Sequence, residues 1–430
     1  MSLMLLSLLL GPSQTVGAPV QAVPASEFLD SLGVCSAVSV RGETLEDTIR
    51  AIEYTGLRWL RLGYESDLPT EDLLALHEAT GARFSYGLQS GGSDIPRLLE
   101  GARRLAQAGA LVAIEGNNEP NNWTVTYQGE EGGGDLSWLP VAKLQRDLYE
   151  AVKSDPLLAD APVWAPTEPG AQTDNVGLQY LTIPEGADTL MPPGTTYADY
   201  ANCHNYLTHP SWPGLHENQT WIAADPGPEC KVDGLYGNYG VTWRNHFRGY
   251  SVEELQDLPR VTTETGVTIG GEITERTQAV LILSCYLDQF TRGWSHTAVY
   301  LLRDRVDEAG NQTFGFYRPD YTPRLSAVYV HNLTTILDGD GRADGLGTLD
   351  YTIGDQPETV HDLLLQKADG TLMLVVWGER FLGGTDSITV DLGEAFGRVS
   401  IYDPTAGPEP VVTVSDIRSL DLGLTDHPLV

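Results

Sequence analysis

The chain has 430 residues, of which 59 are acidic and 26 basic, so that its formal net charge is −33. A hydrophobic fraction of 41% and a charged fraction of 20% are typical of a folded globular protein, and the length allows one large core and a smaller one. So negative a surface repels nucleic acid and anionic lipid. We therefore expect neither nucleic acid nor a membrane as a partner.

The first ten residues form an apolar run, and small residues follow as far as Ala25. This order is typical of a secretory signal, although no basic residue precedes the run. The run is too short to span a bilayer. We therefore predict a signal peptide over residues 1–25 and a secreted mature protein.

Short apolar runs alternate with helical stretches between residue 34 and about residue 335. The pattern predicts eight strands, at 34–40, 57–64, 84–88, 111–115, 163–166, 200–206, 261–266 and 297–302. It predicts helices at 45–54, 71–80, 95–108, 140–153, 272–292 and 323–337. Candidate N-caps are Thr44 and Ser93, and candidate C-terminal stops are Gly56, Gly81 and Gly109.

Strands that alternate with helices form a parallel sheet, and eight such units predict an α/β fold of the (β/α)8 TIM barrel type. An open, doubly wound sheet is the alternative. No GxGxxG motif follows the first strand, which argues against a nucleotide-binding version of that sheet. We assign the barrel to residues 26–338.

The pattern changes at about residue 339, where short strands separated by turns begin. They are expected at 363–365, 372–377, 387–390, 399–402 and 411–414. Asp369 and Gly370 form the expected turn of a hairpin between the first two. Residues 339–430 therefore read as a small, sandwich-like all-β domain behind the barrel.

Two glutamates each follow a predicted barrel strand. Glu119 comes after the fourth strand, in the stretch EGNNEPN, and Glu264 ends the seventh, in VTTETG. Residues at the carboxyl ends of barrel strands meet at one face, and a pair of carboxylates is what glycoside hydrolysis needs. Glu168, which also follows a strand, is the rival acid. An ordinary Asn-Glu-Pro turn is the structural alternative.

Other polar residues lie at the same predicted face. His204 and Tyr206 end the sixth strand on one side of it, and Asn118 precedes Glu119. Arg61 is a charge inside an apolar run, so it needs a partner if it is buried, either Glu115 or Glu264. A surface arginine at a strand edge is the other interpretation.

The region from residue 207 to residue 258 is rich in Pro, Gly and Trp and is expected to be the loop after the sixth strand. Trp212, Trp221 and Trp243 are candidate sugar platforms there, or they pack the loop itself. A disulfide between Cys203 and Cys230 is possible in a secreted protein, whereas Cys35 and Cys285 are expected to be buried thiols. No cysteine and histidine spacing resembles a zinc site.

The stretch from Glu115 to Asn121 resembles the E-x-x-N-E-P-N motif of clan A glycoside hydrolases, especially families 5 and 39. Glu264 in TTETG and the pair His204 and Tyr206 also look like that clan, and the trailing β-domain is similar to those of families 30, 39 and 79. The resemblance implies a TIM barrel, retention of configuration, Glu119 as acid/base and Glu264 as nucleophile.

The sequence departs from the clan at two positions. Asn117 stands where a tryptophan is common, and the eighth strand ends in VYLLRD where many members carry a tryptophan. Tyr300 and Arg303 of that run are candidate substrate-binding residues, and Arg303 either binds a carboxylated sugar or pairs with Asp304. Trp123 is a further candidate substrate-binding residue.

These features together predict a secreted retaining glycoside hydrolase that acts on an oligosaccharide, polysaccharide or other glycoside and needs no cofactor or metal. A transglycosidase on the same site and a non-catalytic carbohydrate-binding barrel are the alternatives. Four glycosylation sequons, at Asn122, Asn218, Asn311 and Asn332, are short enough to arise by chance.

Overall fold

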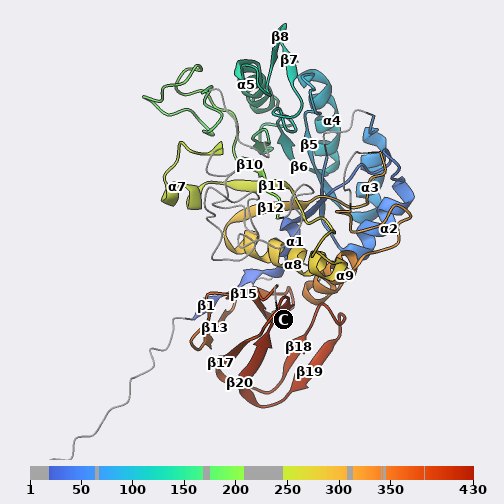
Figure 1. Ribbon diagram of the computed structural model, residues 1–430, viewed down its shortest axis with the longest axis vertical. Helices are drawn as coiled ribbons and strands as arrows, with labels where there is room; N and C mark the ends of the chain where they lie inside the picture. Colours follow the sequence, from blue (N-terminus) through green and yellow to red (C-terminus); the bar gives the residue numbers. More distant parts are fainter. Residues whose placement is uncertain are drawn as a thin grey trace, which may run out of the picture.

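A computed structural model describes residues 19–62, 67–167, 175–207, 246–307, 313–339, 341, 345–381 and 383–430. Figure 1 shows an α/β barrel with an all-β domain packed against one side of it, next to helices α8 (Glu275–Thr291) and α9 (Leu325–Leu337). Glu168, Trp212, Trp221, Trp243 and Cys230, as well as the sequons at Asn218 and Asn311, lie outside the described residues.

The barrel consists of eight parallel strands, and every one of the eight predicted strands is confirmed. They are β3 (Leu32–Cys35), β4 (Trp59–Arg61), β5 (Arg83–Gly87), β6 (Leu111–Glu115), β9 (Val163–Trp164), β10 (Ala201–His204), β11 (Arg260–Thr265) and β12 (Trp294–Val299). Their order in the sheet is β10-β11-β12-β3-β4-β5-β6-β9. A parallel bridge between Trp164 and Tyr200 connects the two edges, so that the barrel is nearly closed.

The first strand is shorter than predicted at its carboxyl end. It was expected to run to residue 40, but β3 ends at Cys35 because the following residues turn around a buried carboxylate. The hydroxyl of Ser36 and the backbone N–H of Ala37 both donate to Glu43. Burial raises the pKa of Glu43 above its usual value, and these two donors oppose the shift.

The predicted helices are also confirmed, with small changes at their ends. The described ranges contain α2 (Leu45–Thr55), α3 (Thr70–Thr80), α4 (Ile95–Ala108), α5 (Leu139–Lys153), α8 and α9. They also contain two short helices that we did not predict, α1 (Ala25–Ser31) and α7 (Val252–Asp257). Thr44 caps α2, and Gly56, Gly81 and Gly109 end their helices in the left-handed conformation that glycine favours. The predicted cap Ser93 is wrong, because Asp94 accepts from the backbone N–H of Arg97 instead.

The C-terminal domain is built from antiparallel sheets, as predicted. One sheet has the order β14-β17-β20, with β14 (Thr352–Ile353), β17 (Asp386–Phe396) and β20 (Ile417–Leu424). Another contains β15 (Val360–Gln366), β16 (Leu372–Gly378) and β21 (Pro428–Leu429), and β18 (Val399–Tyr402) pairs with β19 (Pro410–Val414). The hairpin at Asp369 and Gly370 joins β15 to β16, as expected.

Residues close to the N-terminus belong to this β-domain. Strand β1 (Val20–Gln21) pairs with β13 (Thr348–Leu349), and β2 (Val23–Pro24) runs parallel to β15. The end of the predicted signal peptide therefore overlaps two strands of the fold. Residues 1–18 lie outside the described residues, and the signal peptide stays a prediction.

The barrel and the β-domain share one apolar core, in which Leu365, Val375 and Trp377 of the β-domain contact buried residues of the barrel helices. The indole N–H of Trp377 donates to Asp288 of α8 over 2.8 Å. Cys35 and Cys285 are buried thiols, as predicted, and Cys203 is buried in β10. Within the described ranges, no helix has both the length and the apolar character needed to cross a membrane.

Candidate active site

Glu119 and Glu264 lie close together at the carboxyl ends of β6 and β11. One carboxylate oxygen of each lies within 4.8 Å of the other and of a ring nitrogen of His204. Glu264 is a residue of β11, but β6 ends at Glu115, so that Glu119 lies in the turn that follows rather than at the strand end. The two glutamates singled out in the sequence therefore meet in space.

The turn between β6 and Glu119 is tightly packed, which explains part of its sequence. A Cβ atom at Gly116 would lie 2.8 Å from the backbone nitrogen of Pro166, so only glycine fits there. Glu119 has a positive φ of 44°, which a non-glycine residue adopts only when neighbours hold it. Its backbone N–H donates to Thr167 over 3.2 Å, and its carbonyl accepts from Asn122 and Trp123 over 2.8 Å each.

Glu264 is surrounded by hydrogen-bond donors. Nη1 of Arg61 donates to its Oε2 over 3.1 Å, and the hydroxyl of Tyr206 donates to its Oε1. Burial raises the pKa of Glu264 above its usual value and the charge of Glu119 adds to the shift, while His204, Arg61 and Tyr206 oppose it. Burial also raises the pKa of Tyr206 well above its usual value, so the phenol keeps the proton that it donates.

Arg61 lies at the centre of a buried network. It has both of the carboxylate partners considered for it, because Nη2 donates to Glu115 over 2.8 Å while Nη1 contacts Glu264. Arg61 and Glu115 are each only 1% exposed. The same Nη2 donates to Oδ1 of Asn118 over 2.8 Å, and the amide nitrogen of Asn118 donates to Ser90 over 3.1 Å. The interpretation of Arg61 as a surface residue is therefore wrong.

His204 connects the two glutamates. Its Nδ1 lies 2.7 Å from Oε1 of Glu119 and 3.5 Å from Oε2 of Glu264, and its Nε2 lies 3.3 Å from the hydroxyl of Thr263. Burial lowers the pKa of His204 to about 4, so the ring is neutral at physiological pH. Burial raises the pKa of Glu119 above its usual value, against the opposing effect of Asn122 and Arg61.

The remaining predicted residues lie farther from the two carboxylates or contact them through others. The ring of Tyr300 is 6.4 Å from the ring of Tyr206, between centroids. Trp123 is 54% exposed, beside the turn that holds Glu119. Arg303 does not pair with Asp304, because Asp304 binds Arg324 instead and Arg303 donates from Nε to the carbonyl of Pro319. Their contacts with a substrate stay a prediction.

Several residues of the site had no signal of their own in the sequence. Asn122, noted only as a sequon, donates from its amide to Oε2 of Glu119 over 2.8 Å. Thr263 donates to Glu115 or Asn202 and contacts His204. Arg305 places its guanidinium carbon 5.9 Å from the ring centroid of Tyr300. The one clue to Asn122 in the sequence was its position directly after the EGNNEPN stretch.

The same cluster has the donor atoms of a small cation site. In the part of the chain that the structure describes, Glu119, His204 and Glu264 form the one group of this kind. Their atoms already have partners, however, since Nδ1 of His204 contacts Glu119 and Arg61 neutralises Glu264. The arrangement fits acid–base and nucleophilic chemistry on a neutral molecule better than it fits a metal.

The nearly closed barrel of eight parallel strands with interleaved helices defines a TIM-barrel fold, to which a C-terminal domain of β-sheets is appended. No protein-family model and no curated protein matches the chain. A solved structure of a family 39 glycoside hydrolase from Bacteroides cellulosilyticus WH2 is similar, with 16% identity, a TM-score of 0.54, and coverage of 94% of this chain and 81% of that one.

Two β-glucuronidases match less well. The structure from Dictyoglomus thermophilum has 12% identity and a TM-score of 0.41, with 74% of this chain and 54% of that one covered. The structure from Parabacteroides merdae has 11% identity and a TM-score of 0.43, with 91% and 60% covered. The likeness to the family 39 structure shows a similar fold alone, and no family is assigned.

Proposed function

We propose that the protein is a retaining glycoside hydrolase in which Glu264 is the nucleophile and Glu119 the general acid and base. The observation that carries the proposal is the separation of the two carboxylates, which have one oxygen of each within 4.8 Å of the other. Retaining enzymes need about 5–5.5 Å between the carboxyl groups, whereas inverting enzymes need about 6.5–9.5 Å to admit a water. Oxygens this close support the shorter of the two separations, and with it the retaining mechanism.

The hydrogen bonds support the same division of roles. The hydroxyl of Thr263 has one hydrogen, and its neighbours Glu115 and Asn202 offer only acceptor oxygens, at 2.9 and 3.0 Å. That hydrogen is therefore used, and the contact between Thr263 and His204 needs a hydrogen on Nε2 of His204. A neutral His204 then has a lone pair on Nδ1, and the 2.7 Å contact requires the proton to be on Glu119.

The groups around Glu264, unlike those around Glu119, favour the ionised form of the carboxyl. Every described group that hydrogen-bonds its oxygens is a donor, namely Arg61 and Tyr206, which favours the ionised carboxylate. One carboxyl that is protonated beside one that is ionised is the arrangement that double displacement starts from.

The reaction then follows from these two states. An oxygen of Glu264 forms a bond to the anomeric carbon while the bond to the leaving oxygen breaks, and Glu119 gives its proton to that oxygen. In the second step, ionised Glu119 takes a proton from a water whose oxygen bonds to the same carbon, and the ester bond to Glu264 breaks. A sugar hydroxyl in place of the water would make the protein a transglycosidase.

The test is turnover of a panel of aryl glycosides by Glu119→Gln and Glu264→Gln, because both substitutions keep the size of the side chain. We expect each to lower turnover by at least about 1,000-fold. Azide should restore turnover in the shortened variants Glu119→Ala and Glu264→Ala, where it has room to enter. The glycosyl azide should have the configuration of the substrate in Glu119→Ala and the inverted configuration in Glu264→Ala. The exposed Glu130→Gln is the matched control and should behave as the unchanged protein.

The product of the unchanged protein separates the alternatives. Proton NMR of the first-formed sugar should show retained configuration, and inversion would reject the mechanism. Products longer than the substrate at high substrate concentration would identify a transglycosidase. If no glycoside is turned over while sugars still bind, the protein is a carbohydrate-binding barrel.

A further inference from the structure

The carboxyl group of Glu119 has one buried side and one open side. Its Oε1 contacts His204, which is fully buried and also lies 3.5 Å from Glu264. Its Oε2 accepts a hydrogen bond from the amide of Asn122, which is an exposed residue. The nucleophile proposed above therefore lies on the buried side of Glu119, and solvent reaches the side of Asn122.

The two sides have different roles in the proposed hydrolysis. The sugar that is attacked has to contact Glu264, so it occupies the buried side. The bond that breaks lies opposite the bond that forms, and the leaving oxygen has to reach Glu119 to receive its proton. The rest of the leaving group then continues away from Glu264, onto the open side of Glu119.

Two large apolar side chains are exposed on this open side. Trp123 directly follows Asn122 and is 54% exposed, and Leu136 is 47% exposed. The backbone N–H of Trp123 donates to the carbonyl of Glu119 over 2.8 Å, so that the tryptophan is held next to the acid. An indole in this place is the first large apolar surface that a leaving group meets beyond Glu119.

The segment that carries Leu136 packs against the turn that holds the acid. The backbone N–H of Gly134 donates to the carbonyl of Pro120 over 2.9 Å. The indole N–H of Trp138, which is only 2% exposed, donates to the carbonyl of Gly134 over 3.1 Å and fixes the segment from below. The two exposed apolar side chains therefore belong to one fixed rim of the barrel mouth.

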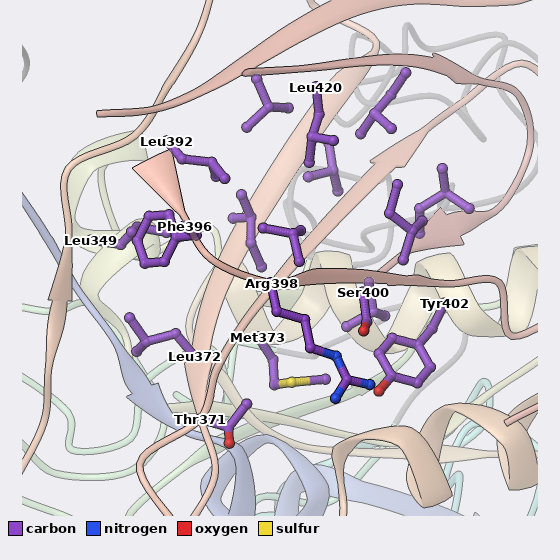
Figure 2. A pocket seen from close by; sticks show the side chains of 18 residues that line it. Leu349, Thr371, Leu372, Met373, Leu392, Phe396, Arg398, Ser400, Tyr402 and Leu420 are labelled. Carbon is purple, nitrogen blue, oxygen red and sulfur yellow. The ribbon is translucent and has the colours of Figure 1, made fainter. Parts of the chain in front are cut away.

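The apolar groove in the C-terminal domain is not a second place for the leaving group. Figure 2 shows Leu392 and Leu420 among the side chains that line it, and its volume is about 530 Å³. All of its lining residues belong to the β-domain, and none comes from the barrel. A leaving group attached to a sugar at Glu264 stays at the carboxyl ends of the barrel strands, so this groove lies outside the reaction.

We propose that Trp123 and Leu136 form the subsite for the leaving group, and that this group is a second sugar ring. A sugar ring has an apolar face of C–H groups and an edge of hydroxyls, so it needs an apolar surface with polar groups beside it. Asn122, Thr124 and Glu131 are exposed beside the rim, and Thr124 donates to Glu131 over 2.8 Å. The subsite rests on the proposed hydrolysis, and it makes the substrate a disaccharide or a longer saccharide.

The experiment compares a disaccharide with the glycosyl fluoride of the same sugar, whose leaving group is too small to reach Trp123. The sugar is the one that the aryl glycoside panel identifies. In Trp123→Ala, we expect kcat/KM to fall at least about tenfold for the disaccharide and to stay within about twofold for the fluoride. Trp123→Phe keeps an aromatic face and should recover most of the loss. Leu157→Ala is the matched control, because Leu157 is 52% exposed but lies between α5 and β9, at the opposite end of the barrel.

A displaced Glu119 would also slow the disaccharide, and the pH profile separates this cause from a lost subsite. The alkaline limb of kcat/KM for the disaccharide reports the pKa of the acid, so it should keep its position in Trp123→Ala. Leu136→Ala is the second variant and should lower kcat/KM for the disaccharide alone, by less than Trp123→Ala. Thermal unfolding checks that each variant is folded.

Three results would overturn the subsite. They are equal losses with the disaccharide and the fluoride, no loss with the disaccharide, and a loss confined to the 4-nitrophenyl glycoside, which would identify an aromatic leaving group. Any of them, in a protein that still turns over the fluoride, rejects the subsite and leaves the proposed hydrolysis intact. If the unchanged protein turns over neither donor, the proposed hydrolysis fails and the subsite fails with it.

Discussion

Arg61 donates a hydrogen bond to Glu264 over 3.1 Å, although two strands, β12 and β3, separate their strands in the sheet. The guanidinium thus reaches across the interior of the barrel mouth rather than along its wall. Because Arg61 is also bound to Glu115, its position is fixed before any substrate arrives. A charge fixed in this way stabilises the ionised form of Glu264 and needs no reorganisation during the proposed reaction.

Replacing Arg61 by glutamine should move the acid limb of the pH profile to higher pH. The arginine opposes the effect of burial on the pKa of Glu264, so without it the pKa rises and a higher pH is needed to ionise Glu264, the proposed nucleophile. We also expect kcat/KM to fall by about 100-fold or more. Profiles of kcat/KM against pH measure both effects.

The matched variant is Arg61→Lys, which keeps the charge but loses the forked geometry. It should leave the acid limb near its original pH while still lowering kcat/KM. In urea unfolding, Arg61→Gln should cost about 3–5 kcal/mol, because it leaves Glu115 buried without its partner. An acid limb that does not move in Arg61→Gln would contradict this role.

Replacing His204 by phenylalanine should move the alkaline limb to lower pH. Neutral His204 accepts the proton of Glu119, which favours the protonated acid, so removal of the acceptor lowers the pKa of Glu119. A hydrogen bond worth about 0.5–1.5 kcal/mol corresponds to at most about one pH unit. A shift to higher pH would show instead that His204 donates to an ionised Glu119.

The eight strands were predictable because each is a short apolar run between helices with recognisable ends. The pairing of Glu119 with Glu264 followed from that topology, since strand ends of a barrel converge at one face. Strand β20 carried a signal too, because Leu420, Leu422 and Leu424 alternate along it, but it was not identified.

Other features depend on contacts between distant residues that one sequence does not reveal. The role of Thr263 arises from its position between His204 and Glu115, which only the barrel brings together. The choice of Asp94 over Ser93 as cap depends on backbone angles, since either side chain is able to accept the bond. Asn332, the asparagine of a sequon in α9, is only 5% exposed, and its amide donates to the carbonyl of Pro404. We therefore do not expect it to be glycosylated.

His427 should make the stability of the protein depend on pH between about 6.5 and 9. Its Nδ1 lies 2.8 Å from Asp426, which Arg276 of the barrel also binds, and its Nε2 lies 3.5 Å from Asp403. Burial alone would lower the pKa of His427, but the bonds to Asp403 and Asp426 raise it to about 9. The stabilisation is therefore complete below about pH 6.5 and is lost as the pH rises through about 9.

The variant His427→Gln tests this. Since the site is partly open to solvent, we expect the unchanged protein to be more stable by about 1–2 kcal/mol at pH 6, with the difference disappearing near pH 10. Urea unfolding at a series of pH values measures it. A difference that grows with rising pH would have the wrong sign and would reject a charged His427.

Trp377→Phe should weaken the attachment of the β-domain to the barrel. Trp377 and Asp288 are both fully buried, and the indole N–H is the donor to Oδ1 of Asp288. Phenylalanine fills most of the space but leaves the carboxyl without that donor, so we expect a loss of about 1–3 kcal/mol in urea unfolding. Asp288→Asn keeps an acceptor for the indole and should cost less. Equal losses in the two variants would show that packing, rather than this hydrogen bond, holds the domains together.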